Sequence, residues 1–146
     1  MALHAKRSGR WLLFLTLLFV GRVVAQPLAA ATGWAWLPPF DAWQSGALPY
    51  PLLLTSQVLI VLIMWRTARA IGGGRLARSR GVGWALALFT GMYGGVMVAR
   101  LVLGLTIARG HWWLDAPLPT VFHLVLTTYL ATVVHHHLRD APDAPR

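Results

Sequence analysis

Two arginines stand inside long apolar stretches, where a positive charge needs a chemical explanation. Arg22 follows the run WLLFLTLLFVG, and Arg100 lies within FTGMYGGVMVARLVLGLT. An arginine at the centre of a membrane-spanning helix costs about 2.5–3.5 kcal/mol on insertion scales, so it usually turns inward and finds a partner. The guanidinium fork suits a carboxylate or a phosphate. The two positions therefore predict either neutralised charges or an anion site.

Other polar side chains are expected near the same end of the spans, either within an apolar stretch or in a connection between two of them. They are Gln26, Asp41, Gln57, Asp115 and His123. In one interpretation Asp41 and Asp115 neutralise the arginines, or the arginines reach lipid phosphates. In the other, the cluster forms a pocket for an anionic or amphiphilic molecule with a phosphate, carboxylate or quinone headgroup. We expect Arg100 to point toward Arg22, with Asp115, Asp41 or a bound anion as its partner.

The histidines raise a haem or metal hypothesis that the sequence supports less well. His123 and His137 would lie about 21 Å apart on one helix face, a separation typical of two stacked haems. Each haem would need a second axial ligand, and no other predicted span carries a histidine. The spacing of His111, Asp115 and His123 matches no standard metal site. We therefore expect no cofactor and no metal.

The residue types also argue against an enzyme. The chain has no cysteine, which excludes thiolate chemistry and iron–sulfur clusters, and it also has no glutamate. Neither the G-x-S-x-G nor the H-E-x-x-H pattern occurs. We identify no catalytic residues and expect no enzymatic activity.

The elements that must position these residues are predicted to be membrane-spanning helices. Of the 146 residues 57% are hydrophobic and only 12% charged, too few charges for the surface of a soluble domain. Apolar runs long enough to cross a bilayer recur four times. We predict an all-α, four-helix transmembrane bundle, a single domain over 1–146, with spans at about 11–31, 50–70, 82–107 and 119–135. Gly91 and Gly95 form a G-x-x-x-G pair that permits close helix packing.

The distribution of positive charge predicts the orientation of these spans. The net charge is +9. Outside the spans, every Lys and Arg except Arg109 lies near a terminus or around the loop 71–81. The positive-inside rule then places both termini and this loop in the cytoplasm, and the connections 32–49 and 108–118 outside. We predict a multi-pass protein of the bacterial inner membrane. The first outer connection, rich in tryptophan, is expected to carry a short interfacial helix.

The same charges bear on binding partners. Because the arginines flank apolar segments, they are better explained by anionic lipid headgroups at the cytoplasmic loop than by nucleic acid. The bilayer is thus the expected partner, together with a second membrane protein or another copy of the chain. An N-terminal signal peptide over residues 1–25 stays open as an alternative. Arg22 before its cleavage site and the apolar stretch PLAAATGWAW after it favour an uncleaved span.

Two segments, PPFDAWQSGALPYPLLL and WLDAPLPTVFHLVL, resemble small bacterial inner-membrane proteins of similar length that have no assigned activity. The resemblance implies a multi-pass inner-membrane protein and no catalytic residues. The first functional hypothesis is therefore a structural or accessory subunit of a membrane assembly. The alternative is a small binding or transport protein that uses a pocket in the outer leaflet, and haem or metal binding comes third.

Overall fold

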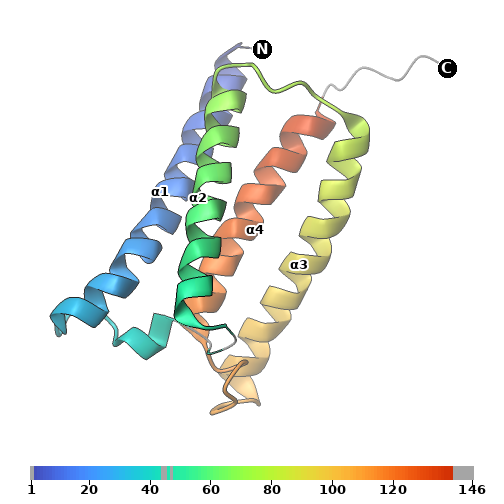
Figure 1. Ribbon diagram of the computed structural model, residues 1–146. Coiled ribbons are helices and arrows are strands. Elements are labelled where there is room, and N and C mark those ends of the chain that lie inside the picture. Colours follow the sequence, from blue (N-terminus) through green and yellow to red (C-terminus); the bar gives the residue numbers. More distant parts are fainter. Residues whose placement is uncertain (1, 44–45, 47, 140–146) are drawn as a thin grey trace.

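The computed structural model describes residues 2–43, 46 and 48–139, and in these ranges all regular structure is helical (Figure 1). The long helices are α1 (Ala2–Thr32), α2 (Tyr50–Gly72), α3 (Arg80–Thr106) and α4 (Pro117–Leu138). All four are long and apolar enough to cross a membrane. The prediction of four such helices is confirmed.

Most helix ends lie within three residues of the predicted spans, but α1 begins nine residues earlier than predicted, because polar residues extend it beyond the apolar run. α1 includes the basic segment before Trp11, since Ala, Leu, Lys and Arg all favour helix. At the start of α3, the Ser79 side chain accepts a hydrogen bond from the Val82 amide at 3.4 Å. α2 and α4 both begin with proline in the first turn, where its missing N–H costs nothing.

The first connection, 33–49, holds less helix than the interfacial helix expected there. Its described part contains one 3-10 turn, η1 (Phe40–Trp43). Trp43 is 6% exposed, and its ring lies 6.4 Å from that of Phe122 in α4. The turn therefore packs against the bundle through its tryptophan.

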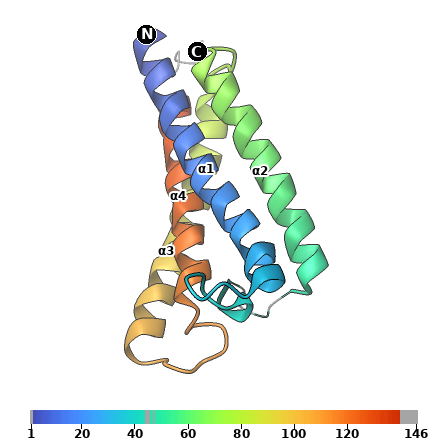
Figure 2. The ribbon, with the colours of Figure 1, turned by 90° about the vertical axis from the view of Figure 1, so that its left-hand side faces the viewer.

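The helices form two hairpins, α1 with α2 and α3 with α4, which contact one another mainly through α1 and α4. α1 packs along α2, α3 packs along α4, and α1 contacts α4, so that α2 and α3 lie apart (Figures 1 and 2). Both described ends of the chain and the α2–α3 connection lie at one end of the bundle, which we call the terminal end. The opposite, distal end carries η1 and the α3–α4 connection.

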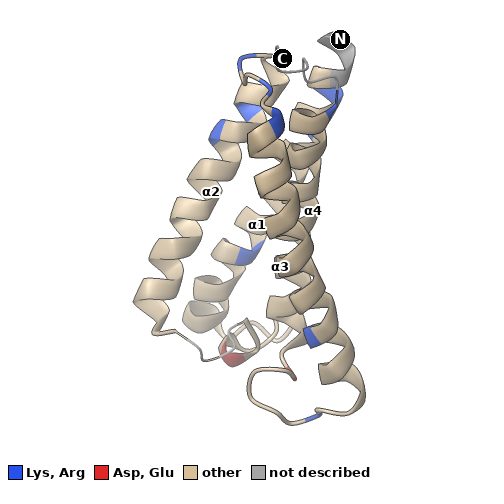
Figure 3. Ribbon diagram, turned by 90° about the vertical axis from the view of Figure 1, so that its right-hand side faces the viewer, with Lys and Arg blue, Asp and Glu red and all other residues tan. Residues whose placement is uncertain are grey.

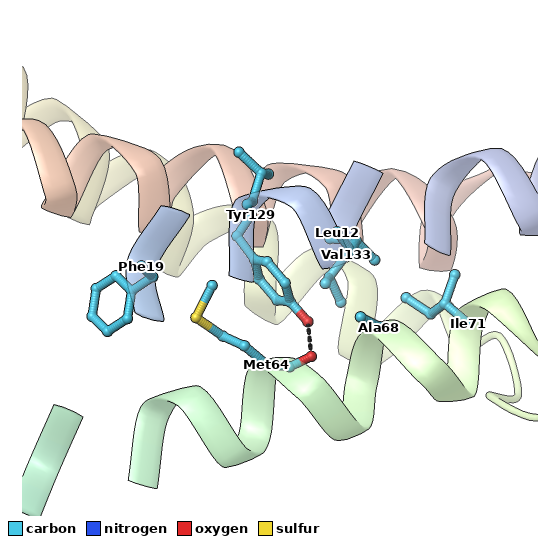
Figure 4. Packing of buried hydrophobic residues seen from close by; sticks show 8 residues of the cluster. Leu12, Phe19, Met64, Ala68, Ile71, Tyr129 and Val133 are labelled. Atoms are coloured by element: carbon cyan, nitrogen blue, oxygen red, sulfur yellow. Dashed lines mark hydrogen bonds between the residues drawn. The ribbon is translucent and has the colours of Figure 1, made fainter. Parts of the chain in front are cut away.

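The apolar core occupies the half of the bundle nearer the terminal end. It is built from Leu12, Leu15 and Phe19 of α1, Met64, Ala68 and Ile71 of α2, and Tyr129 and Val133 of α4 (Figure 4). The Tyr129 hydroxyl donates a hydrogen bond of 2.6 Å to the carbonyl oxygen of Met64. Since this bond crosses from α4 to α2, it fixes the hairpins relative to one another.

Three glycines of α3 permit its close packing within the chain. A Cβ on Gly83, Gly94 or Gly104 would overlap Leu138, Thr127 or the Leu114 carbonyl, respectively. Gly91 and Gly95 lie instead on the exposed face of α3, where an added Cβ would meet nothing within 4 Å. Within this chain, therefore, α3 does not use the predicted G-x-x-x-G pair for packing.

Candidate functional site

The distal half of the bundle encloses a cavity of about 190 Å³, which we call the distal cavity. All four helices contribute to its lining, together with Leu48 before α2. The polar lining residues are Arg22 from α1, Ser56 and Gln57 from α2, Tyr93 from α3 and His123 from α4. The rest of its wall is apolar, including Phe19, Leu53, Ile60, Phe122 and Leu126.

Arg22 brings a buried positive charge to the distal cavity. The side chain is 6% exposed, and its Nη2 donates a hydrogen bond of 2.8 Å to the carbonyl oxygen of Trp43 in η1. Its guanidinium carbon also lies 5.6 Å from the ring centroid of Phe122. The other terminal nitrogen, Nη1, is buried and has no hydrogen-bond partner in the described part of the chain. Arg22 thus keeps donor capacity next to the cavity.

The remaining polar groups supply both donors and acceptors. The Tyr93 hydroxyl is hydrogen-bonded to Nδ1 of His123, and their rings meet edge to face. Gln57 is 3% exposed, and its Oε1 is buried without a partner among the described residues. The Ser56 hydroxyl is already used, since it donates to the Leu53 carbonyl at 2.7 Å. Gln57 and the Tyr93–His123 pair are therefore the groups able to complement Arg22.

Arg100 is buried near this site but does not line the distal cavity. It is 3% exposed, its Nε donates to the carbonyl oxygen of Trp113 at 2.9 Å, and its guanidinium lies 4.5 Å from the Trp113 ring centroid. Its Nη2 is buried and unpartnered among residues 2–43, 46 and 48–139. The two arginines are alike: each holds the backbone of a tryptophan in a distal connection.

The predicted acidic partners lie elsewhere. Asp41 and Asp115 are exposed, and neither forms an ion pair within 4.0 Å with Arg22 or Arg100. Asp115 accepts a hydrogen bond from the Gly110 amide at 2.7 Å, which closes its own connection. Two carbonyl oxygens thus occupy the positions expected for carboxylates.

Of the predicted polar cluster, the structure brings Arg22, Gln57 and His123 together around one cavity. Gln26 is fully buried one turn along α1 from Arg22, and neither end of its amide has a partner in the described ranges. The prediction omitted Tyr93 as a site residue. Its signal was its position seven residues before Arg100, on the same face of the helix.

His137 lies outside the distal cavity and makes a structural contact. Nδ1 of His137 accepts a hydrogen bond from the Ser79 amide at 3.2 Å, which ties α4 to the start of α3. In the described part of the chain, no three His or Asp side chains are grouped to hold a metal ion. His111, Asp115 and His123 are therefore not assembled into a site.

Comparison with known proteins adds no assignment. No family model, no curated protein and no solved structure matches the chain.

Proposed function

We propose that this is a multi-pass protein of the bacterial inner membrane that binds the anionic headgroup of an amphiphile in the distal cavity. Its termini would lie in the cytoplasm and the cavity in the outer half of the bilayer. One observation carries the proposal: the buried side chain of Arg22 lines the distal cavity with an N–H group that has no partner, and none of the described acids neutralises it.

An anion is favoured because of the local charge. A buried charge without a partner costs several kcal/mol, and a ligand of opposite sign removes that cost. Arg100 adds a second buried cation on α3, which packs along α4. These positive charges favour a carboxylate or phosphate over a neutral quinone headgroup.

The apolar wall and the size of the cavity limit the ligand further. Phe19, Ile60 and Leu126 offer surface for a hydrocarbon chain. The volume of about 190 Å³ is below the roughly 300–1,000 Å³ of pockets that enclose a drug-sized molecule. The cavity therefore suits a headgroup and the beginning of one chain. In this arrangement Arg22 binds the anion, and Gln57 and Tyr93 orient it.

A pair of chain-matched ligands tests the proposal. Dodecanoate and dodecanol differ only in the charge of the headgroup, so only the carboxylate should bind to the purified protein in maltoside detergent. Loss of a hydrogen bond to a charged group costs about 1.5–3 kcal/mol, so Arg22→Gln should weaken dodecanoate binding roughly tenfold or more. Arg109→Gln, at an exposed cation of the distal connection, is the matched control and should bind normally. Equal binding of the alcohol, or equal losses in both variants, would refute the proposal.

A second candidate function is that of an accessory subunit, favoured by the exposed pair Gly91 and Gly95. Small residues one turn apart let a partner helix approach the backbone closely. Gly95→Leu should then abolish crosslinking between α3 and its partner in membranes. Gly21→Leu, at another exposed glycine with open space around it, should leave crosslinking intact. If Gly95→Leu leaves the crosslinks unchanged, or if no crosslink forms in the wild type, no partner packs closely against these glycines.

A further inference from the structure

A second cavity lies at the terminal end, between α1 and α2, and we call it the basic cavity. Its volume is about 540 Å³. Four cationic side chains line it: Lys6 and Arg10 from α1, Arg69 from α2, and Arg75 just after α2. Leu13 and Trp65 provide apolar lining. Figure 3 shows how Lys and Arg gather at this end of the bundle.

The packing of the two helices holds these cations in place. A Cβ on Gly9 would lie 2.4 Å from the Cα of Gly72, so the backbones of α1 and α2 are in direct contact there. The guanidinium of Arg69 lies 5.7 Å from the ring centroid of Trp65. The Arg75 side chain folds back over Gly73, where a Cβ would stand 3.4 Å from its Nε. The basic cavity is thus built around a glycine contact at which larger residues would separate the helices.

The charge of this cavity is uncompensated by the described chain. None of its lining residues is acidic, and the described acids, Asp41 and Asp115, lie in the two connections at the distal end. The four cations are exposed, so water screens part of their mutual repulsion, and an anion between them would lower it further. Phosphate, with several acceptor oxygens, is the anion that clustered Arg and Lys bind best.

From this geometry we infer that the basic cavity binds the phosphate of an anionic phospholipid from the cytoplasmic leaflet. Its phosphodiester would lie among Arg10, Arg69 and Arg75, and its glycerol and first methylenes would contact Leu13 and Trp65. A lipid is favoured over a soluble phosphate because the apolar lining continues into the exposed apolar surface of α2, at Leu62 and Ile63. The inference requires membrane insertion but is independent of the distal cavity and Arg22.

Binding of single lipids in detergent tests this inference. In detergent there is no anionic bilayer surface that would attract the basic protein regardless of a specific site. We would add dioleoyl phosphatidylglycerol or dioleoyl phosphatidylcholine to the delipidated full-length chain in dodecyl maltoside. Native mass spectrometry measures the bound lipid, and thermal unfolding measures its stabilising effect. Inorganic phosphate alone is the third ligand, and it separates a lipid headgroup from a free anion.

Two double variants remove the same charge from the same region of the chain. Arg69→Gln with Arg75→Gln alters the basic cavity, whereas Arg66→Gln with Arg78→Gln alters cations outside its lining. A basic residue near an anionic lipid contributes roughly a fivefold preference, so the first pair should weaken phosphatidylglycerol binding more than tenfold. The second pair should stay within about twofold of the wild type, and Arg69→Lys with Arg75→Lys should retain most of the binding.

The outcomes are decisive in both directions. Selective loss in the first pair, with unchanged unfolding temperatures of the lipid-free variants, supports the site. Equal losses in both glutamine pairs would show general charge attraction and overturn it. Equal retention of phosphatidylcholine and phosphatidylglycerol, or equal stabilisation by inorganic phosphate, would overturn the assignment to an anionic lipid. Because Arg22 is intact throughout, the distal cavity is the same in every variant, so a difference between the variants reports on the basic cavity alone.

Discussion

Arg22 and Arg100 illustrate how a buried cation in an apolar bundle finds partners in the backbone. Each donates one hydrogen bond to a tryptophan carbonyl, at 2.8 Å and 2.9 Å, and each lies over an aromatic ring. A carbonyl dipole satisfies a donor without neutralising its charge. The positive charge of each arginine therefore persists at the distal end, which is what an anionic ligand requires.

At the same scale, removal of the hydroxyl group from Tyr129 and from Tyr50 should have different effects on the free energy of unfolding. Tyr129 donates from a buried position to the Met64 carbonyl, whereas the buried hydroxyl of Tyr50 has no partner in the described chain. Tyr129→Phe should lower the free energy of unfolding by about 0.5–1.5 kcal/mol. Tyr50→Phe should leave it unchanged or raise it, because an unsatisfied polar group is removed. Thermal unfolding in detergent measures both, and equal losses would contradict the hydrogen-bond assignment.

The residue types alone predict part of the site. Arg22, Gln57 and His123 stand out because polar groups in apolar runs are costly and therefore informative. The carbonyls of Trp43 and Trp113 could not be predicted this way, since every residue carries a carbonyl. Pairing with Asp41 or Asp115 is the natural expectation from charge, but the turns that direct these side chains outward depend on connection geometry.

Among the elements, α3 shows how glycines divide a helix into an inward and an outward face. Gly83, Gly94 and Gly104 contact other parts of the chain, while Gly91 and Gly95 face outward. The sequence predicts close approach at glycine, but six glycines on one helix allow several packing faces. The low amphipathicity of α3 does not indicate which face is buried, because the helix is apolar on all sides.

Substitution by alanine should affect stability differently at the inward-facing and the outward-facing glycines of α3. An alanine Cβ at Gly104 would overlap the Leu114 carbonyl, so the α3–α4 connection must shift. We expect Gly104→Ala to destabilise the protein by about 1–3 kcal/mol. Gly95→Ala is the matched control and should be neutral or stabilising by up to about 1 kcal/mol, since alanine favours helix. Similar unfolding temperatures for the two variants would contradict this packing of α3.

For the whole molecule, the even number of long helices brings both described ends of the chain to the same end of the bundle. The number, type and approximate limits of the helices are predictable because apolar runs and flanking arginines are strong local signals. The way in which the two hairpins pack together is not predictable, since it depends on contacts between distant residues, such as that of Tyr129 in α4 with Met64 in α2.

Reporter fusions test the proposed orientation of the whole chain. Fusions of a cytoplasm-active and a periplasm-active reporter at Arg75 and after the C-terminus should both report the cytoplasm, because most Lys and Arg lie on that side. A fusion at Gly110, in the α3–α4 connection, is the control and should report the periplasm. A periplasmic result at Arg75 or at the C-terminus would overturn the four-span arrangement.

The central claim is that the distal cavity holds an anionic amphiphile through Arg22, and the molecules that the protein retains from its own membrane test it most directly. Native mass spectrometry of the gently extracted full-length protein measures them. We predict that the wild type and Arg109→Gln carry the same bound acid, identified after release as a carboxylate or phosphate with a hydrocarbon chain, and that Arg22→Gln carries one molecule fewer, since a phospholipid in the basic cavity would remain. A wild-type protein free of any such acid, or an Arg22→Gln variant that retains it in full, would contradict the account.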